Sequence, residues 1–121
     1  MTNYQNLEVW KKSMTLVKDV YLELKLYPRE EMFGLTQQTK RAVVSISANI
    51  AEGIGRNHKK DTIQFLHISR GSLYEVETLL QIGLMLEFSS SDKIDFLLLQ
   101  INDCTRLLNG LISYYEKSNL R

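Results

Sequence analysis

The sequence predicts an all-α fold, in the form of an antiparallel, up-down-up-down four-helix bundle. Four long segments carry apolar residues with a period near 3.6, the pattern of amphipathic helices. Only one proline and six glycines occur among 121 residues, so long uninterrupted helices are possible. Hydrophobic residues make up 44% of the chain, which is enough for a core, and the length fits one domain spanning residues 1–121.

The first predicted helix runs from Leu7 to Leu26 and has a single apolar side. Pro28 ends it, because the residue before a proline is pushed out of the α-helical region. The apolar side consists of Val9, Trp10, Ser13, Met14, Leu16, Val17, Val20, Tyr21 and Leu24. The opposite side carries three lysines at heptad spacing, which are typical of a solvated face although they could contact nucleic acid: Lys11, Lys18 and Lys25.

The second predicted helix follows a connector at residues 27–34 and has three faces instead of two. Thr36 is its expected N-cap, and Gly53 and Gly55 are expected to end it in a left-handed conformation. The broad apolar face holds Leu35, Ala42, Val43, Ile46, Ile50 and Ile54. A polar seam holds Gln38, Arg41, Ser45, Asn49, Glu52 and Arg56. A second apolar stripe contains only small residues: Val44, Ala48, Ala51 and Gly55.

The third predicted helix runs from Thr62 to Leu86, with Asp61 as its expected cap. Its core face consists of Phe65, Ile68, Ser69, Ser72, Leu73, Val76, Leu79, Leu80 and Gly83. Gly71 costs about 1 kcal/mol relative to alanine in a helix interior. We therefore expect a neighbouring helix, most simply the small-residue second helix, to approach Gly71, Ser69 and Ser72 closely.

The fourth predicted helix runs from Lys93 to Lys117 after a serine-rich break, with Ser91 as its expected N-cap. Its core face consists of Ile94, Leu97, Leu98, Ile101, Cys104, Leu108, Leu111, Ile112 and Tyr115. A further apolar stripe lies nearly opposite: Phe96, Leu99, Leu107 and Tyr114. Two helices with spare apolar stripes predict a homo-oligomer interface, formed by this stripe or by Val44, Ala48 and Ala51.

Several motifs resemble the four helix bundle protein family, also called the 23S rRNA intervening sequence protein or S23-type family. The resemblance rests on Gly34-Leu-Thr-Gln-Gln, on Ser45-Ile-Ser-Ala-Asn-Ile-Ala-Glu-Gly53, and on Gly71-Ser-Leu-Tyr-Glu75. It implies a non-catalytic protein that assembles into rings, typically pentamers. It also implies an association with intervening sequences of ribosomal RNA genes. A related protein, the accessory variability determinant of diversity-generating retroelements, binds nucleic acid and a reverse transcriptase.

Catalytic and metal-binding patterns are missing from the sequence, so we expect no enzyme activity, no cofactor and no metal. Cys104 lies on the predicted core face, where a structural thiol is more common than a nucleophile. Its single occurrence excludes an intramolecular disulfide. His58 and His67, the only histidines, do not have the spacing of a zinc or di-iron site. No leader or membrane span is recognisable, and we expect a cytoplasmic bacterial protein.

Charge is distributed unevenly along the chain. Residues 36–70 hold six basic and two acidic side chains, a net charge of +4, so the rest must be −3 because the whole chain is +1. This favours an anionic partner, and the predicted nucleic-acid-binding residues are Lys40, Arg41, Arg56, Lys59 and Lys60. The alternative is a protein-interaction scaffold with no nucleic-acid contact. Asn49 and Glu52 fit either a partner-contacting seam or a network that fixes helix register, with Glu52 paired to Arg41, Arg56 or Arg70.

Overall fold

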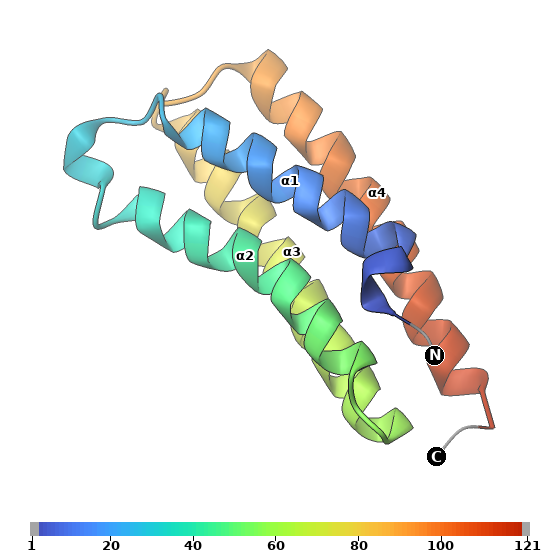
Figure 1. Cartoon of the computed structure of the whole chain (residues 1–121). Coiled ribbons are helices and arrows are strands. Elements are labelled where there is room, and N and C mark those ends of the chain that lie inside the picture. Colours follow the sequence, from blue (N-terminus) through green and yellow to red (C-terminus); the bar gives the residue numbers. More distant parts are fainter. Residues whose placement is uncertain (1–2, 120–121) are drawn as a thin grey trace.

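Four α-helices make up the bundle in the computed structural model, which describes residues 3–119. They are α1 (Glu8–Leu24), α2 (Leu35–Ile54), α3 (Lys59–Met85) and α4 (Ser91–Lys117), and two 3-10 turns, η1 (Tyr4–Asn6) and η2 (Arg29–Glu31), precede α1 and α2. Successive helices run in opposite directions (Figure 1). Both α1 and α3 pack against α2 and α4, so the four helices surround one core. The predicted four-helix bundle is confirmed. None of the described helices combines the length and apolarity that a membrane crossing requires.

The predicted apolar faces form the core, with a few exceptions. Leu16, Ile46, Leu73, Leu80 and Leu108 are among the fully buried side chains, one or more from each helix. Ile68 and Met14 were expected in the core but are exposed. In α3 the core position belongs to Leu66 instead, because it continues the i, i+3, i+7 series of Ser69 and Leu73, whereas Ile68 points about 200° away from Leu66.

The closest packing joins α2 and α3 through hydroxyl groups. Thr62 Oγ1 donates to the Gly53 carbonyl at 2.7 Å, and Ser69 Oγ donates to the Ile46 carbonyl at 2.8 Å. A Cβ atom on Gly53 would lie 2.9 Å from Phe65 Cβ. The expected close approach of a neighbouring helix at Ser69 and Ser72 is therefore confirmed. The expectation for Gly71 is wrong, since its missing Cβ would meet no atom within 4 Å.

The helix ends differ from the predictions in their capping groups. Thr36 is buried, and the N-cap of α2 is Gly34, where a Glu31 carboxylate oxygen accepts the Leu35 N–H at 3.1 Å. The last helix is capped by Ser90 and not by Ser91. Gly55 ends α2 in a right-handed conformation with φ −79°, so the predicted left-handed cap is wrong.

Glu87, just after α3, is the one non-glycine residue with positive φ among residues 3–119, at 66°. Phe88 N–H donates to the Gly83 carbonyl at 2.8 Å and Glu87 N–H to the Leu84 carbonyl at 3.0 Å, the paired bonds of a Schellman motif. We expect Glu87→Gly to raise the free energy of unfolding by about 1 kcal/mol, because glycine adopts this conformation without steric cost. Urea unfolding should show this; a less stable variant would indicate that the Glu87 side chain contributes a contact.

Candidate nucleic-acid interface

The turn between α2 and α3, residues 55–58, and the first residues of α3 carry three of the predicted basic residues. Helix α3 begins at Lys59, and its N-cap residue His58 makes no side-chain capping bond. The predicted cap, Asp61, lies in the first turn and does not cap the helix. The first amides of α3 are therefore left without a side-chain acceptor at the positive end of the helix dipole.

Three cationic side chains surround this helix start. The Arg56 guanidinium lies 4.7 Å from the centroid of the Phe65 ring and 2.6 Å from a Glu52 carboxylate oxygen. Lys59 Nζ donates to the Ser118 carbonyl at 3.1 Å, which brings the end of α4 beside the turn. Lys60 is exposed on the first turn of α3. The structure thus brings together three of the five predicted binding residues.

Lys40 and Arg41 lie elsewhere, near the other end of α2. Lys40 precedes Ile54, the last residue of α2, by 14 positions, which is roughly 20 Å along the axis at about 1.5 Å per residue. Its ammonium sits 5.0 Å from the centroid of the Tyr21 ring on α1. The five predicted residues therefore form two separate groups.

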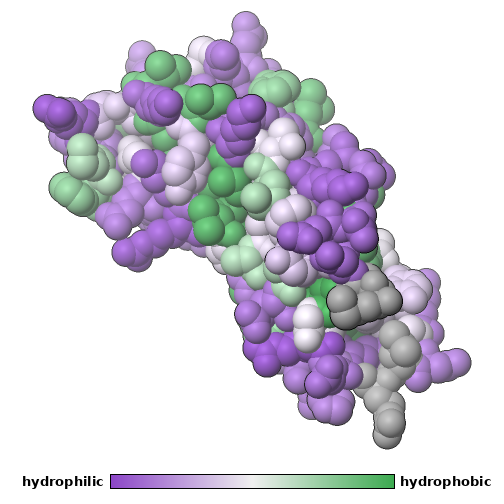
Figure 2. All heavy atoms as spheres, viewed as in Figure 1, coloured by the Kyte–Doolittle hydropathy of each residue, from purple (hydrophilic) through white to green (hydrophobic). Residues whose placement is uncertain are grey.

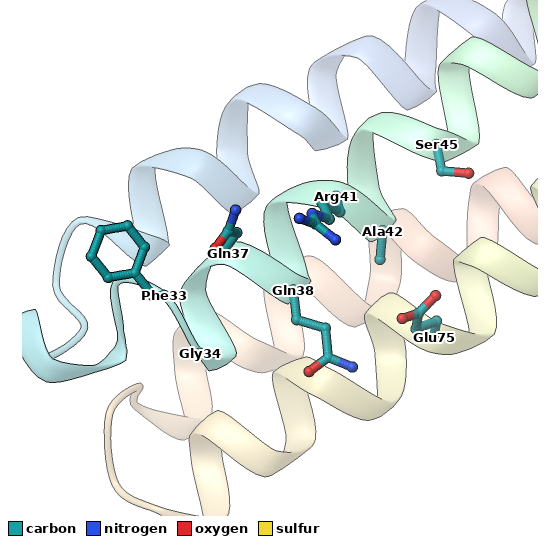
Figure 3. Close-up of a pocket in the computed structure, with 8 residues that line it drawn as sticks. All are labelled: Phe33, Gly34, Gln37, Gln38, Arg41, Ala42, Ser45 and Glu75. Carbon is teal, nitrogen blue, oxygen red and sulfur yellow. The ribbon is translucent and has the colours of Figure 1, made fainter.

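Arg41 lines a pocket between α2 and α3 with a volume of about 640 Å³ (Figure 3). Sequence reasoning missed Glu75, which comes from α3 and faces the α2 side chains across this pocket. The other lining residues are Phe33, Gly34, Gln37, Gln38, Ala42 and Ser45. Three of the lining residues, Gln38, Arg41 and Ser45, belong to the polar seam predicted on α2. That seam was therefore the sequence pattern from which this pocket could have been predicted.

The polar seam continues from Ser45 as a hydrogen-bond chain. Ser72 Oγ donates to Ser45 Oγ at 2.9 Å, linking α3 to α2. Asn49 Nδ2 donates to Ser45 Oγ at 2.9 Å and to the Ser45 carbonyl at 2.8 Å. Glu52 pairs with Arg56, one of the three predicted partners. Asn49 is thus part of a network that joins two helices.

The two spare apolar stripes lie on the surface of the chain. Phe96, Leu99 and Tyr114 on α4 are 53%, 65% and 61% exposed, and Leu107 is half-buried beside them. On α2, Val44 and Ala48 are exposed and Ala51 is half-buried. Figure 2 shows hydrophobic side chains at the surface where the middle of α2 lies beside α1. The rest of the described chain leaves both stripes largely uncovered.

Cys104 is fully buried in the core, and burial raises the pKa of its thiol to about 11. The thiol therefore stays protonated at neutral pH and is a poor nucleophile. Within residues 3–119, no three His, Cys, Asp or Glu side chains come close enough together to hold a metal ion.

The comparisons with known proteins give the family. The chain is similar in fold to a protein of unknown function from the S23 ribosomal protein family of Bacteroides thetaiotaomicron, with a TM-score of 0.80. The two are 24% identical, over 87% of this chain and 95% of that one, so this likeness concerns the fold alone. No curated protein matches the chain. Residues 5–110, most of the 121, match the 23S rRNA-intervening sequence proteins. The chain therefore belongs to the 23S rRNA-intervening sequence protein family.

Proposed function

We propose that the protein is a non-catalytic, cytoplasmic homo-oligomer that binds RNA or DNA, as an accessory protein associated with rRNA intervening sequences. The observation that supports this best is the start of α3, where uncapped amides lie beside Arg56, Lys59 and Lys60. Free amides and the helix dipole favour an anion at this position, and a nucleic-acid phosphate supplies one. Membership of the family agrees with an RNA-related role.

The ion pair between Arg56 and Glu52 does not prevent Arg56 from contacting a phosphate. The Arg56 and Glu52 side chains are 42% and 52% exposed, and exposed ion pairs at i, i+4 contribute only about 0.3–0.5 kcal/mol. A phosphate can therefore replace Glu52 at little cost. In a homo-oligomer the turn is repeated in every subunit, so weak contacts reinforce one another on one long strand.

We predict that replacing Arg56, Lys59 and Lys60 together by alanine weakens binding to RNA and duplex DNA while the bundle stays folded. Binding releases fewer counterions when fewer phosphates are contacted. The plot of log affinity against log salt should therefore become less steep, by about 0.9 per lost contact for duplex DNA and about 0.7 for single strands. Fluorescence anisotropy with labelled oligonucleotides of unrelated sequence, over a series of salt concentrations, measures both slope and affinity.

The matched control removes the same charge from another surface. Lys11 and Lys18 on α1 and Lys25 at its C-cap are all exposed, and their triple alanine variant loses three positive charges as well. If the two triple variants lose affinity equally, the binding reflects net charge and not the turn. If the wild-type protein binds neither nucleic acid at low salt, the proposal fails.

A protein-interaction scaffold is the second candidate function. The observation that favours it is the 640 Å³ pocket with Arg41 on one wall and Glu75 on the other, which offers opposite charges to a polar partner. Such a pocket lies in the size range of ligand sites, roughly 300–1,000 Å³. Loss of a partner protein from an Arg41→Ala variant, with nucleic-acid binding unchanged, would support the scaffold.

A further inference from the structure

Glu23, on the last turn of α1, is a buried acidic residue with one carboxylate oxygen that has no hydrogen-bond partner. The residue is only 6% exposed, and its Oε2 atom accepts no hydrogen bond. A buried charge is costly unless it is paired and hydrogen-bonded. Burial raises the pKa of Tyr27, the Ser89 hydrogen bond lowers it in part, and the nearby Glu23 carboxylate adds a smaller increase.

Glu23 is one of the residues that line a small pocket between α1 and α4, with a volume of about 170 Å³. Leu22, Leu26 and Leu97 contribute apolar surface to the lining, and the exposed Phe96 ring lines the pocket as well. Asp19 adds a second carboxylate, one oxygen of which accepts from Gln100 Nε2 at 2.9 Å. The lining therefore combines three leucines and one aromatic ring with two acidic residues and one lysine, Lys93.

This combination fits the end of a lysine or arginine side chain. The apolar walls match the methylene stem, the carboxylate matches the charged head, and an aromatic ring face attracts cations. The volume is below the roughly 300 Å³ at which pockets for whole small molecules begin. A metal ion is a poorer fit, because no three ligating side chains converge within the described part of the chain. Lys93 lines the pocket too, but it gives Glu23 Oε2 no hydrogen bond.

The source of this cation follows from where the pocket lies. Phe96 borders the pocket and also begins the exposed apolar stripe of α4, so the pocket continues the surface that we expect between subunits. Residues 36–70 carry a net charge of +4 and the remainder of the chain, which includes α1 and α4, carries −3. We propose that Glu23 receives a lysine or arginine side chain from residues 36–70 of a second copy of this chain. This inference rests on the homo-oligomer of the proposed function.

The isosteric variant Glu23→Gln tests this directly. It removes the charge and keeps the shape, so we expect self-association of the full-length protein to weaken by about 30-fold or more, the usual consequence of losing one partner of a buried charge pair. The unfolding midpoint of the dissociated chain should be unchanged or higher, since an unpaired buried charge has gone. Glu8→Gln, an exposed glutamate on the same helix, is the matched control and should leave self-association unchanged. Sedimentation velocity over a concentration series gives the dissociation constants.

Double-mutant cycles then identify the partner residue. Alanine variants of the six basic residues between 36 and 70 are each combined with Glu23→Gln, and one should show a non-additive effect on self-association. Wild-type affinity in Glu23→Gln overturns the inference alone, whereas a monomeric wild type overturns the assembly itself. Coupling between Glu23 and Lys93 in the unfolding of the single chain would assign the charge to its own lysine. Stabilisation of wild type but not Glu23→Gln by putrescine, with self-association unaffected, would show a free amine instead.

Discussion

Gly53→Ala should lower the free energy of unfolding by about 1–3 kcal/mol, the usual cost of overpacking a tight site. The added methyl would lie 2.9 Å from Phe65 Cβ and 3.1 Å from the Thr62 carbonyl oxygen. Both atoms belong to or adjoin the α3 backbone, which cannot move aside without shifting the helix. Gly53 is the next-to-last residue of α2, so the helix-propensity gain of alanine, about 1 kcal/mol in a helix interior, offsets little of this.

Gly71→Ala is the matched comparison, with the opposite expected sign. Gly71 lies in the interior of α3 and faces open space, so alanine should stabilise the isolated bundle by about 1 kcal/mol. Urea denaturation of the two variants beside the wild type measures both effects. A Gly53→Ala variant as stable as Gly71→Ala would show that α2 and α3 are further apart than described.

The second large effect concerns the exposed stripe on α4. We expect a variant with serine at Phe96, Leu99 and Tyr114 to remain folded but to lose self-association. Burying one large apolar side chain fully is worth about 1.5–3 kcal/mol, and these three are already partly covered. A combined loss of roughly 4 kcal/mol, or about a thousandfold in dissociation constant, follows.

Light scattering at micromolar concentration measures this difference. The control removes two still more exposed apolar side chains from other surfaces, through Phe33→Ser and Met85→Ser, and should leave the assembly unchanged. A wild-type monomer at this concentration would contradict the prediction. If the control disrupts the assembly and the α4 variant does not, the interface lies on another face.

Periodicity predicted the helices and most of the core because burial of an apolar face decides both. It did not predict the caps, which depend on groups outside the helix: the Leu35 amide is satisfied by Glu31 from the preceding turn, and not by Thr36. For Gly71 the sequence showed a helix-propensity cost, but the space around a glycine is a property of the packed molecule. That space turned out to be open.

The candidate site was predictable only where its residues are close in sequence. Arg56, Lys59 and Lys60 meet because one short turn joins two antiparallel helices. Lys40 lies away from them, against the Tyr21 ring of α1, and no local sequence pattern predicts this contact. Glu23 gave no signal either, because one carboxylate beside an apolar face is usually solvated, whereas the packed bundle leaves Glu23 only 6% exposed.

The hydroxyl contacts between α2 and α3 have a consequence for the order of folding. The two helices are separated by only four residues, so bringing them together costs little loop-closure entropy, and their contacts are closer in sequence than those between α1 and α4. Thr62 and Ser69 then fix the register of the pair by donating to backbone carbonyls of α2. This hairpin can form before α1 and α4 dock, whereas the α1–α4 surface, which holds Glu23, closes a loop of most of the chain. The amides of α2 and α3 should therefore exchange with solvent last, and the α1–α4 side should open first.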